Sequence, residues 1–157
     1  MPPKNKAAVK NLDRILFTTD FSAASENAAP YALMLAKQNK ARLYVMHVVD
    51  VSNDMAGFYV PHMSYEILDK ELEVAAGGMI QKFCAKQFGG YKNVEPIVAV
   101  GVPYKEIMGA IKGKNINMVI MAASGMGEVG RLLFGSTADR VLRHATCPVL
   151  VIPPAIR

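Results

Sequence analysis

The fold is decided by one stretch of the chain, Met118-Val-Ile-Met-Ala-Ala-Ser-Gly-Met-Gly-Glu-Val-Gly-Arg-Leu-Leu-Phe-Gly-Ser-Thr137. It begins as an apolar run typical of a buried strand, continues through a loop with four glycines, and ends with two hydroxyl residues that favour a helix start. Glycine lets a backbone turn tightly and approach a ligand closely, and free N–H groups at a helix start attract anions. The stretch therefore predicts a strand, a loop that holds the phosphates of a nucleotide, and a helix.

Strand and helix patterns alternate along the rest of the chain. Continuous apolar runs predict strands at residues 14–20, 41–50, 93–100, 116–122 and 147–152, and helical spacing predicts helices that begin at Ser22, Ser64, Pro103 and Ser136. This alternation predicts an α/β fold with a single open parallel sheet, covered on both faces by helices in right-handed crossovers. Ligands of such sheets bind beyond the carboxyl ends of the strands where the strand order reverses, and polar residues after the first and fourth strands place that point between them.

Local signals refine some of these elements. Ser22 is a favourable N-cap for the first helix, and Pro96 suits an edge position for the third strand. In the second helix we expect one buried stripe, formed by Leu68, Leu72, Ala75, Met79 and Phe83. Gly77 and Gly78 weaken that helix by about 1 kcal/mol each relative to alanine, and close packing against the sheet would explain why they are tolerated.

Length and composition indicate one globular domain. The chain has 157 residues, of which 52% are hydrophobic and 20% are charged. We expect a flexible basic tail over residues 1–10 and a single folded domain over residues 11–157. Residues 1–14 hold four Lys and Arg residues and one Asp, so they contribute +3 of the net charge of +5. A charged tail is usually only solvated, so we do not expect a nucleic-acid partner.

The sequence also argues against a membrane segment, a disulfide framework and a metal site. No apolar run reaches membrane-spanning length and the first fourteen residues lack the core of a signal peptide, so we expect a cytoplasmic protein with no membrane partner. Cys84 and Cys147 lack CxxC spacing, so we expect buried free thiols. The three histidines form no metal-binding pair, and His47, within an apolar strand, is interpreted as a packed core residue rather than a base.

Two phosphate-binding patterns are nearly present in the loop. Residues 130–137 match a P-loop except for its lysine, which argues against the usual mechanism of nucleotide hydrolysis. Gly125, Gly127 and Gly130 have the spacing of a dinucleotide fingerprint, but that pattern belongs at the first strand of its unit, with an acidic residue about 20 positions further on. Each pattern alone is weak.

At four places the chain resembles the universal stress protein family, and the resemblance extends from Asn11 to Pro153. The residues that carry it are ILFTTDFS at 15–22, HVVD at 47–50, the loop at 122–137 and CPVLV at 147–151. The nucleotide-binding branch of the family has Gly, two residues, Gly, nine residues, and Gly followed by Ser or Thr. This chain has Ala122 in place of the first glycine, then Gly125, Gly135 and Ser136 at the same spacing.

The resemblance implies a Rossmann-like fold with strand order 3-2-1-4-5 that binds ATP, ADP or AMP, with Mg²⁺ or Mn²⁺ brought in on the phosphates. Asp20 would bind the ribose hydroxyls, the Val48 backbone the adenine, and the glycine loop the phosphates. The expected binding residues are Thr18, Thr19, Asp20, Val48, Ala122, Ser124, Gly125, Met126, Gly127, Gly135, Ser136 and Thr137. The resemblance also implies a two-fold homodimer joined through the C-terminal strand, residues 147–152.

Structural interpretations of the same residues stay open at this point. Asp20 could simply brace the first helix, the glycines could only form a turn, and Ser136 and Thr137 could only cap the last helix. The favoured function is a stress-response regulatory module whose conformation or dimer state reports ATP occupancy, with no catalytic residue. One alternative is a slow nucleotide hydrolase or phosphotransferase that uses Asp20, Glu128 or Arg131 in the same pocket. Another is a dimeric adaptor that binds no nucleotide.

Overall fold

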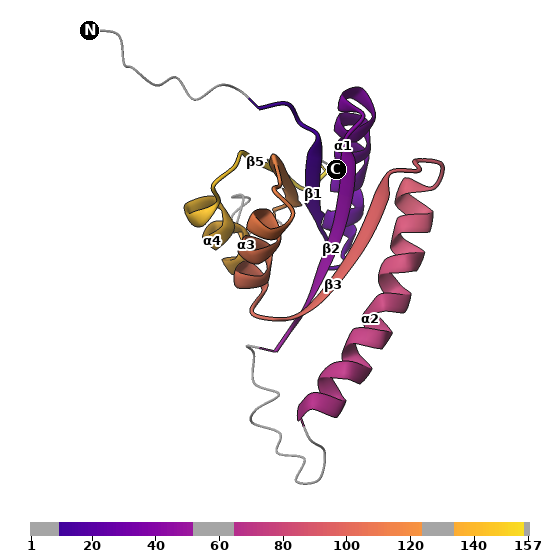
Figure 1. The fold of residues 1–157 in the computed structure, drawn as a ribbon, viewed down its shortest axis with the longest axis vertical. Helices are drawn as coiled ribbons and strands as arrows, with labels where there is room; N and C mark the ends of the chain where they lie inside the picture. The colour runs from indigo at the N-terminus through magenta and orange to yellow at the C-terminus, as the bar shows by residue number, and fades with distance from the viewer. Residues whose placement is uncertain (1–9, 52–64, 124–133, 156–157) are drawn as a thin grey trace, which may run out of the picture.

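The computed structural model describes residues 10–51, 65–123 and 134–155 (Figure 1). Its elements follow one another as β1 (Arg14–Thr18), α1 (Ala23–Asn39), β2 (Arg42–Asp50), α2 (Tyr65–Phe88), β3 (Val94–Gly101), α3 (Pro103–Gly113), β4 (Met118–Ala122), α4 (Ser136–His144) and β5 (Val149–Ile152). The five strands form one parallel sheet in the order β3-β2-β1-β4-β5, which confirms the predicted fold. β1 lies between β2 and β4, so the strand order reverses between β1 and β4, as predicted.

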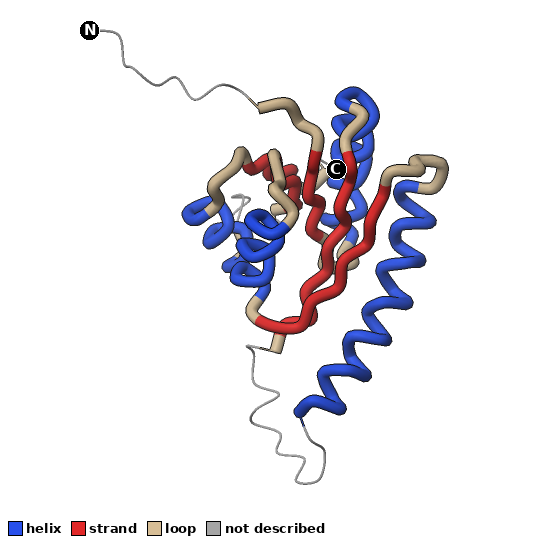
Figure 2. Tube along the Cα trace, in the orientation of Figure 1, coloured by secondary structure: helices blue, strands red, loops and turns tan. Residues whose placement is uncertain are grey.

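Helices cover both faces of the sheet (Figure 2). α1 and α2 pack on one face, over a core that includes Phe17, Val45 and Ile80. α3 and α4 pack on the other face, over a core that includes Leu16 and Met46. Successive side chains of a strand point to opposite faces, which is why the neighbours Leu16 and Phe17 belong to different cores.

The start of α1 is capped as the sequence predicts. The side chain of Ser22 accepts a hydrogen bond from the backbone N–H of Ser25, with 3.3 Å between the two atoms. The buried face of the helix is made of small residues, since Ala28, Ala29, Ala32 and Ala36 are all fully buried. Small side chains let the helix backbone approach the sheet closely, which brings its capped end against the carboxyl end of β1.

The buried stripe of α2 differs from the predicted one. Over residues 69–88, where the structure describes the side chains, the buried residues are Ala76, Ile80, Phe83 and Phe88. Met79 is 52% exposed and Ala75 is also exposed, so the prediction was wrong at both positions. The two phenylalanines of α2 pack against Phe17, with ring centroids 6.1 and 5.7 Å apart, and burying these rings sets the rotation of the helix. The side chain of Leu68 lies outside the described residues.

The glycine pair of α2 is not explained by packing. A Cβ atom added to Gly77 or Gly78 would meet no atom within 4 Å. The interpretation that close contact with the sheet requires these glycines was therefore wrong, and nothing in the described residues accounts for them.

Two strands begin two residues later than predicted. β4 begins at Met118 rather than at residue 116, and β5 begins at Val149 rather than at residue 147. Before β4, Asn117 uses its side-chain oxygen to accept a hydrogen bond from the backbone N–H of Arg14 at 2.8 Å. Before β5, Pro148 has no N–H to donate to a sheet. β3 lies at an edge, as its Pro96 predicts.

Candidate functional site

A cleft of about 560 Å³ lies at the carboxyl ends of β1, β2 and β4, beside the reversal of the strand order. Ligands of open α/β sheets bind at such a place. The predicted residues that line the cleft are Thr18, Thr19, Asp20, Val48, Ala122, Gly135, Ser136 and Thr137. The other four, Ser124, Gly125, Met126 and Gly127, lie outside the described residues. The fold thus brings residues from the ends of three strands and the start of α4 to one cleft.

Thr19 is fixed by hydrogen bonds of both its backbone and its side chain. Its N–H donates to the carbonyl of Met46 at 2.9 Å, and its hydroxyl accepts from the N–H of Phe21 at 2.9 Å. The same hydroxyl lies 2.8 Å from the hydroxyl of Ser25, which in turn donates to the carbonyl of Ser22 at 3.0 Å. The Thr19 hydroxyl therefore donates to Ser25. Because these groups satisfy one another, Thr19 shapes the wall of the cleft with its backbone.

His47 connects this wall to β2. Its Nδ1 atom lies 2.8 Å from the carbonyl oxygen of Thr19. Since a carbonyl can only accept, Nδ1 carries a proton and donates it. The imidazole ring also packs against Phe21, with ring centroids 4.3 Å apart. His47 is half-buried and lines the cleft, so its interpretation as a packed core residue was only partly correct.

The turn from β1 into α1 depends on an unusual backbone conformation. Phe21 has a φ of 64°, in the left-handed region that residues with a Cβ rarely adopt. Its N–H is bound by Thr19, and its ring packs between His47 and Phe83, with the Phe83 centroid 5.8 Å away. These contacts hold the strained residue in place, and Asp20 and Ser22 on either side of it both line the cleft.

Asp20 is an ionised acceptor at the rim of the cleft. Its Oδ1 atom accepts a hydrogen bond from the backbone N–H of Ser22 at 3.0 Å. Partial burial acts to raise the pKa of Asp20, but hydrogen bonds to its carboxylate, chiefly from the side chain and the backbone of Ser22, outweigh the burial and lower this pKa. Asp20 therefore braces the start of α1, which was the alternative interpretation of this residue. It also presents a negative charge to the cleft.

The backbone of Val48 faces the side of β2 where β1 has ended. The carbonyl of Met46 accepts from Thr19, so the polar backbone groups of Met46 point toward β1. Residues two apart in a strand point the same way, so the N–H and C=O of Val48 share this direction. The register of β1 against β2 ends at Thr18 and Met46. Among the described strands, none pairs with Val48 on that side, which leaves a neighbouring donor and acceptor at the cleft.

The start of α4 is not capped by a side chain. Gly135 is the N-cap residue, with φ −62° and ψ 162°, and no side-chain hydrogen bond closes this end of the helix. Ser136 and Thr137 are the first two helical residues, so the interpretation of their hydroxyls as caps was wrong. The first N–H groups of a helix have no partner within it and carry its positive dipole end, so this helix start suits an anion.

The remaining wall of the cleft is largely apolar, with Val49, Ile107 and Met121 among its residues. These residues, together with Ser25 and His47, were not predicted from the sequence to line a site. His47 directly precedes the predicted Val48, and Ser25 lies one turn after the predicted cap, so both had a local signal. Ile107 comes from α3, and only the fold brings it to the cleft.

Other kinds of site can be tested in the parts of the chain that the structure describes. No group of three or more His, Cys, Asp or Glu residues there could hold a metal ion. Cys84 and Cys147 are free, and burial raises the pKa of the Cys84 thiol to about 11 and also raises that of Cys147. None of the described helices combines the length and the apolar character needed to cross a bilayer.

Comparison with known proteins places the chain in a family. The model of the universal stress protein family matches residues 11–153. The universal stress protein MJ0531 of Methanocaldococcus jannaschii is 32% identical over 141 residues, which are 88% of this chain and 81% of that protein. The solved UspA from Lactobacillus plantarum is 29% identical, with a TM-score of 0.69 over 91% of this chain and 99% of that one. The solved MJ0577 of M. jannaschii has a TM-score of 0.76 at 22% identity, over 94% and 100% of the two chains.

Two more distant structures with the same fold hold nucleotides. One is a universal stress protein in complex with cAMP, 18% identical with a TM-score of 0.66 over 92% of this chain and 98% of that one. The other is the universal stress protein from Archaeoglobus fulgidus in complex with dAMP, 16% identical with a TM-score of 0.64 over 91% and 99% of the two chains. At these identities the likeness shows the fold alone.

Proposed function

The chain belongs to the universal stress protein family, and from this premise we propose that it binds an adenine nucleotide, ATP, ADP or AMP, in the cleft beyond β1, β2 and β4. One observation carries the proposal. The cleft combines an open backbone donor and acceptor at Val48, an ionised carboxylate at Asp20 and an uncapped helix start at Gly135. These three features match the base, the sugar and the phosphates of one nucleotide.

The backbone of Val48 has the polarity that adenine requires. Adenine presents a donor, its exocyclic amino group, beside an acceptor, its ring N1, and one strand residue presents a C=O beside an N–H. The apolar side chains of Val49 and Ile107 line the same cleft and would exclude water from the faces of the base. Two family members solved with cAMP and dAMP support an adenine nucleotide as the ligand.

Asp20 would accept hydrogen bonds from the ribose hydroxyls. An ionised carboxylate is an acceptor only, and its hydrogen bonds are stronger than those of a neutral group. The lowered pKa keeps Asp20 in this form at neutral pH. The same bonds from Ser22 that lower its pKa also fix the carboxylate, so ribose would meet an acceptor already in position.

The start of α4 and the glycine loop would hold the phosphates. Gly135, Ser136 and Thr137 line the cleft, and two of them carry hydroxyls that no cap engages. We propose that Ser124, Gly125, Met126 and Gly127 complete this part of the site. Mg²⁺ or Mn²⁺ would arrive with the phosphates, because hard cations prefer oxygen ligands and phosphates supply them.

We propose a regulatory module rather than an enzyme, acting in the cytoplasm in the stress response. A nucleotide that binds the folded state stabilises it by mass action, and such binding needs no catalytic group. We further propose a homodimer through residues 147–152. β5 is an edge strand of the sheet, and an edge strand presents backbone groups that can pair with another chain.

The decisive experiment is mass spectrometry of the small molecules released when the purified protein is denatured. We expect ATP, ADP or AMP, and a rise in melting temperature when ATP, but not GTP, is added. Gly125→Val should abolish that rise without unfolding the protein. If no nucleotide is released and millimolar ATP leaves the melting temperature unchanged, the proposal fails and a dimeric adaptor remains.

Turnover of ATP separates the regulatory module from a hydrolase. We expect fewer than about one turnover per minute, compared with a typical enzyme median of about 10 per second. This low rate should survive Glu128→Ala and Arg131→Ala. A rate of several per second that either substitution removes would identify an enzyme instead.

A further inference from the structure

A second groove, about 980 Å³ in volume, lies at the other end of the sheet. It is lined by Arg14 at the start of β1, Met118 at the start of β4, Pro148 just before β5, and residues near the ends of α3 and α4. The nucleotide cleft is instead lined by residues at the carboxyl ends of β1 and β4. Because the strands are parallel and β1 extends over roughly 15 Å at about 3.3 Å per residue, the two sites are separate.

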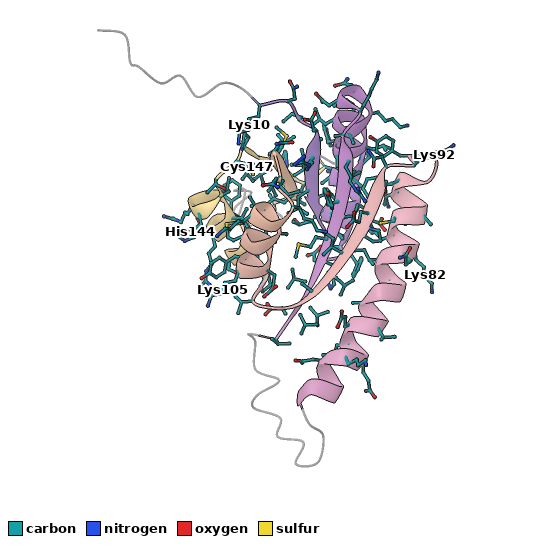
Figure 3. All side chains as sticks on the ribbon, viewed as in Figure 1. Lys10, Lys82, Lys92, Lys105, His144 and Cys147 are labelled. Atoms are coloured by element: carbon teal, nitrogen blue, oxygen red, sulfur yellow. The ribbon has the colours of Figure 1, made fainter. Side chains whose placement is uncertain are left out.

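The rim of this groove is positively charged. Lys10, Arg14, Lys112 and His144 line it, come from four different segments of the chain, and are all exposed. No Asp or Glu is present among the described residues that line the groove. Figure 3 shows Lys10 and His144 on the side of α3 and α4, whereas Lys82 and Lys92 lie on the side of α2.

The lysines and the arginine of the rim have no acidic partners in the described part of the chain. Ion pairs there engage other cations, namely Arg42 and Lys114 with Glu95, Lys86 with Glu26, and Arg143 with Asp139. None of them includes a residue of the rim. The positive charges of Lys10, Arg14 and Lys112 therefore add up over the groove, and several unpaired charges of one sign attract an ion of the other sign.

Helix ends explain only part of this charge. Cations in the last turn of a helix offset the partial negative charge of its final carbonyl groups, and Lys112 lies in the last turn of α3. Lys10 and Arg14 belong to the segment before β1 and to β1 itself. No helix end requires them, yet they line the same groove.

The floor of the groove is apolar. It includes Leu12, Met108, Ile111, Ile116, Met118 and Cys147, of which Ile111 and Ile116 are only 5% and 6% exposed. Small-molecule sites typically have volumes of about 300–1,000 Å³, mostly apolar walls and a few polar groups that orient the ligand. An inorganic ion would leave this floor in contact with water, whereas a ligand with an apolar body would cover it.

We propose that this groove is a second binding site, separate from the nucleotide cleft, for an organic anion with an apolar body. A medium-chain alkyl carboxylate is the simplest such molecule. Its chain lies on Met108, Ile111 and Met118, and its carboxylate lies at the rim near Arg14 and Lys112. The inference rests on the groove alone and does not depend on nucleotide binding.

The test is a titration of the full-length ¹⁵N-labelled protein, without nucleotide, followed by NMR. The three probes are sodium octanoate below its micelle concentration, octylammonium chloride and sodium phosphate. Octanoate should give saturable shifts at the amides of residues 108–112 and 117–118 and at Cys147. Octylammonium has the same chain with the opposite charge, and phosphate has the charge without the chain, so neither should saturate these signals.

Matched double variants show whether the charged rim is responsible. Arg14→Gln with Lys112→Gln should weaken octanoate binding at least tenfold, since it removes two rim charges from exposed positions. Lys82→Gln with Lys92→Gln removes the same charge on the side of α2 and should leave the affinity unchanged. Met108→Glu, which places a carboxylate on the floor, should also abolish binding. Melting temperatures check that each variant is folded.

Several results would overturn the proposal. One is the absence of saturable shifts with octanoate at millimolar concentrations. Another is saturation by octylammonium or by phosphate at the same amides, which would mean a purely apolar or a purely ionic site. Equal weakening by the two double variants would mean that only the net charge of the protein matters. None of these results bears on ATP, whose binding is measured separately.

Discussion

The imidazole of His47 and the carbonyl of Thr19 join the second strand to the turn that follows the first, through a hydrogen bond of 2.8 Å. This bond fixes which ring nitrogen carries the proton and keeps the backbone before Asp20 against β2. Phe21 packs on the same ring. His47 therefore positions the backbone on the side of the cleft that Asp20 lines.

Replacing His47 should affect both stability and affinity. His47→Ala removes one hydrogen bond and one ring contact, so we expect the free energy of unfolding to fall by about 1–2 kcal/mol. Urea unfolding measures this change, and calorimetry should show weaker ATP binding. His47→Asn keeps an N–H donor near the same place and should recover part of both effects. Equal losses with alanine and asparagine would contradict the role of the hydrogen bond.

Asp20→Asn separates the charge of the carboxylate from its role in the turn. The amide oxygen can still accept from Ser22, so the fold should persist, while the charged acceptor that we propose for ribose is lost. A hydrogen bond to a charged group contributes about 1.5–3 kcal/mol, so ATP affinity should fall roughly tenfold or more. Calorimetry with ATP gives the affinity, and the melting temperature of the free protein is the control. An unchanged affinity would mean that Asp20 does not contribute to ATP binding.

The same variant predicts a pH dependence of stability. The pKa of Asp20 in the folded protein is below its ordinary value of 3.8, so its ionised form stabilises the fold. This contribution is complete above the ordinary pKa and is lost as the pH falls through the lowered value. The difference in unfolding free energy between wild type and Asp20→Asn should therefore be constant from about pH 7 to 5 and change only below about pH 4. A change near pH 6 would contradict the assignment.

Gly135 is predicted to serve ligand binding at the expense of stability. Its φ of −62° suits any residue, so the backbone does not require glycine there. Gly135→Asp would supply an N-cap and should stabilise the free protein by a few tenths of a kcal/mol, yet its charge should repel phosphates and abolish ATP binding. Gly135→Ser caps without charge and should bind ATP better than the Asp variant. If the Asp variant binds ATP like wild type, the phosphates lie elsewhere.

Two glycines with free space around them should respond to alanine in opposite directions. An added Cβ meets no atom within 4 Å at Gly78, inside α2, or at Gly90, whose φ is +93°. Gly78→Ala should stabilise the protein by about 1 kcal/mol through helix propensity. Gly90→Ala should destabilise it by about 1 kcal/mol, since L residues avoid positive φ. Thermal unfolding measures both, and destabilisation by Gly78→Ala would indicate a contact of α2 with another molecule.

The order of elements could be predicted from the sequence because parallel strands are buried on both faces and are therefore apolar throughout. The rotation of α2 could not. Ala75 and Met79 lie on one face of the helix, and their neighbours Ala76 and Ile80 lie on a face about 100° away. Both faces are apolar, so the sequence pattern is compatible with burial of either one. Only the contact of the α2 phenylalanines with Phe17 selects one of them.

The part of the cleft formed by residues that follow a strand could be predicted from the sequence. Asp20 could be placed there because it follows the first predicted strand, beside the reversal in strand order, whereas Val48, inside β2, was expected only from the family resemblance. The hydrogen bonds among Thr19, Ser25 and His47 could not be predicted, because they depend on the left-handed conformation of Phe21. No local sequence pattern predicts that conformation. Ser136 and Thr137 were expected at the right helix start, but the cap itself is Gly135.

The wall around Thr19 is held in place by the protein's own hydrogen bonds. Immobilising a flexible side chain during association costs about 0.5–1.5 kcal/mol. Thr19, Ser25 and His47 already restrain one another, so this part of the cleft loses little conformational entropy when it is filled. Selection among ligands at this wall then depends on their shape and polarity, because the pre-organised surface does not adapt to them.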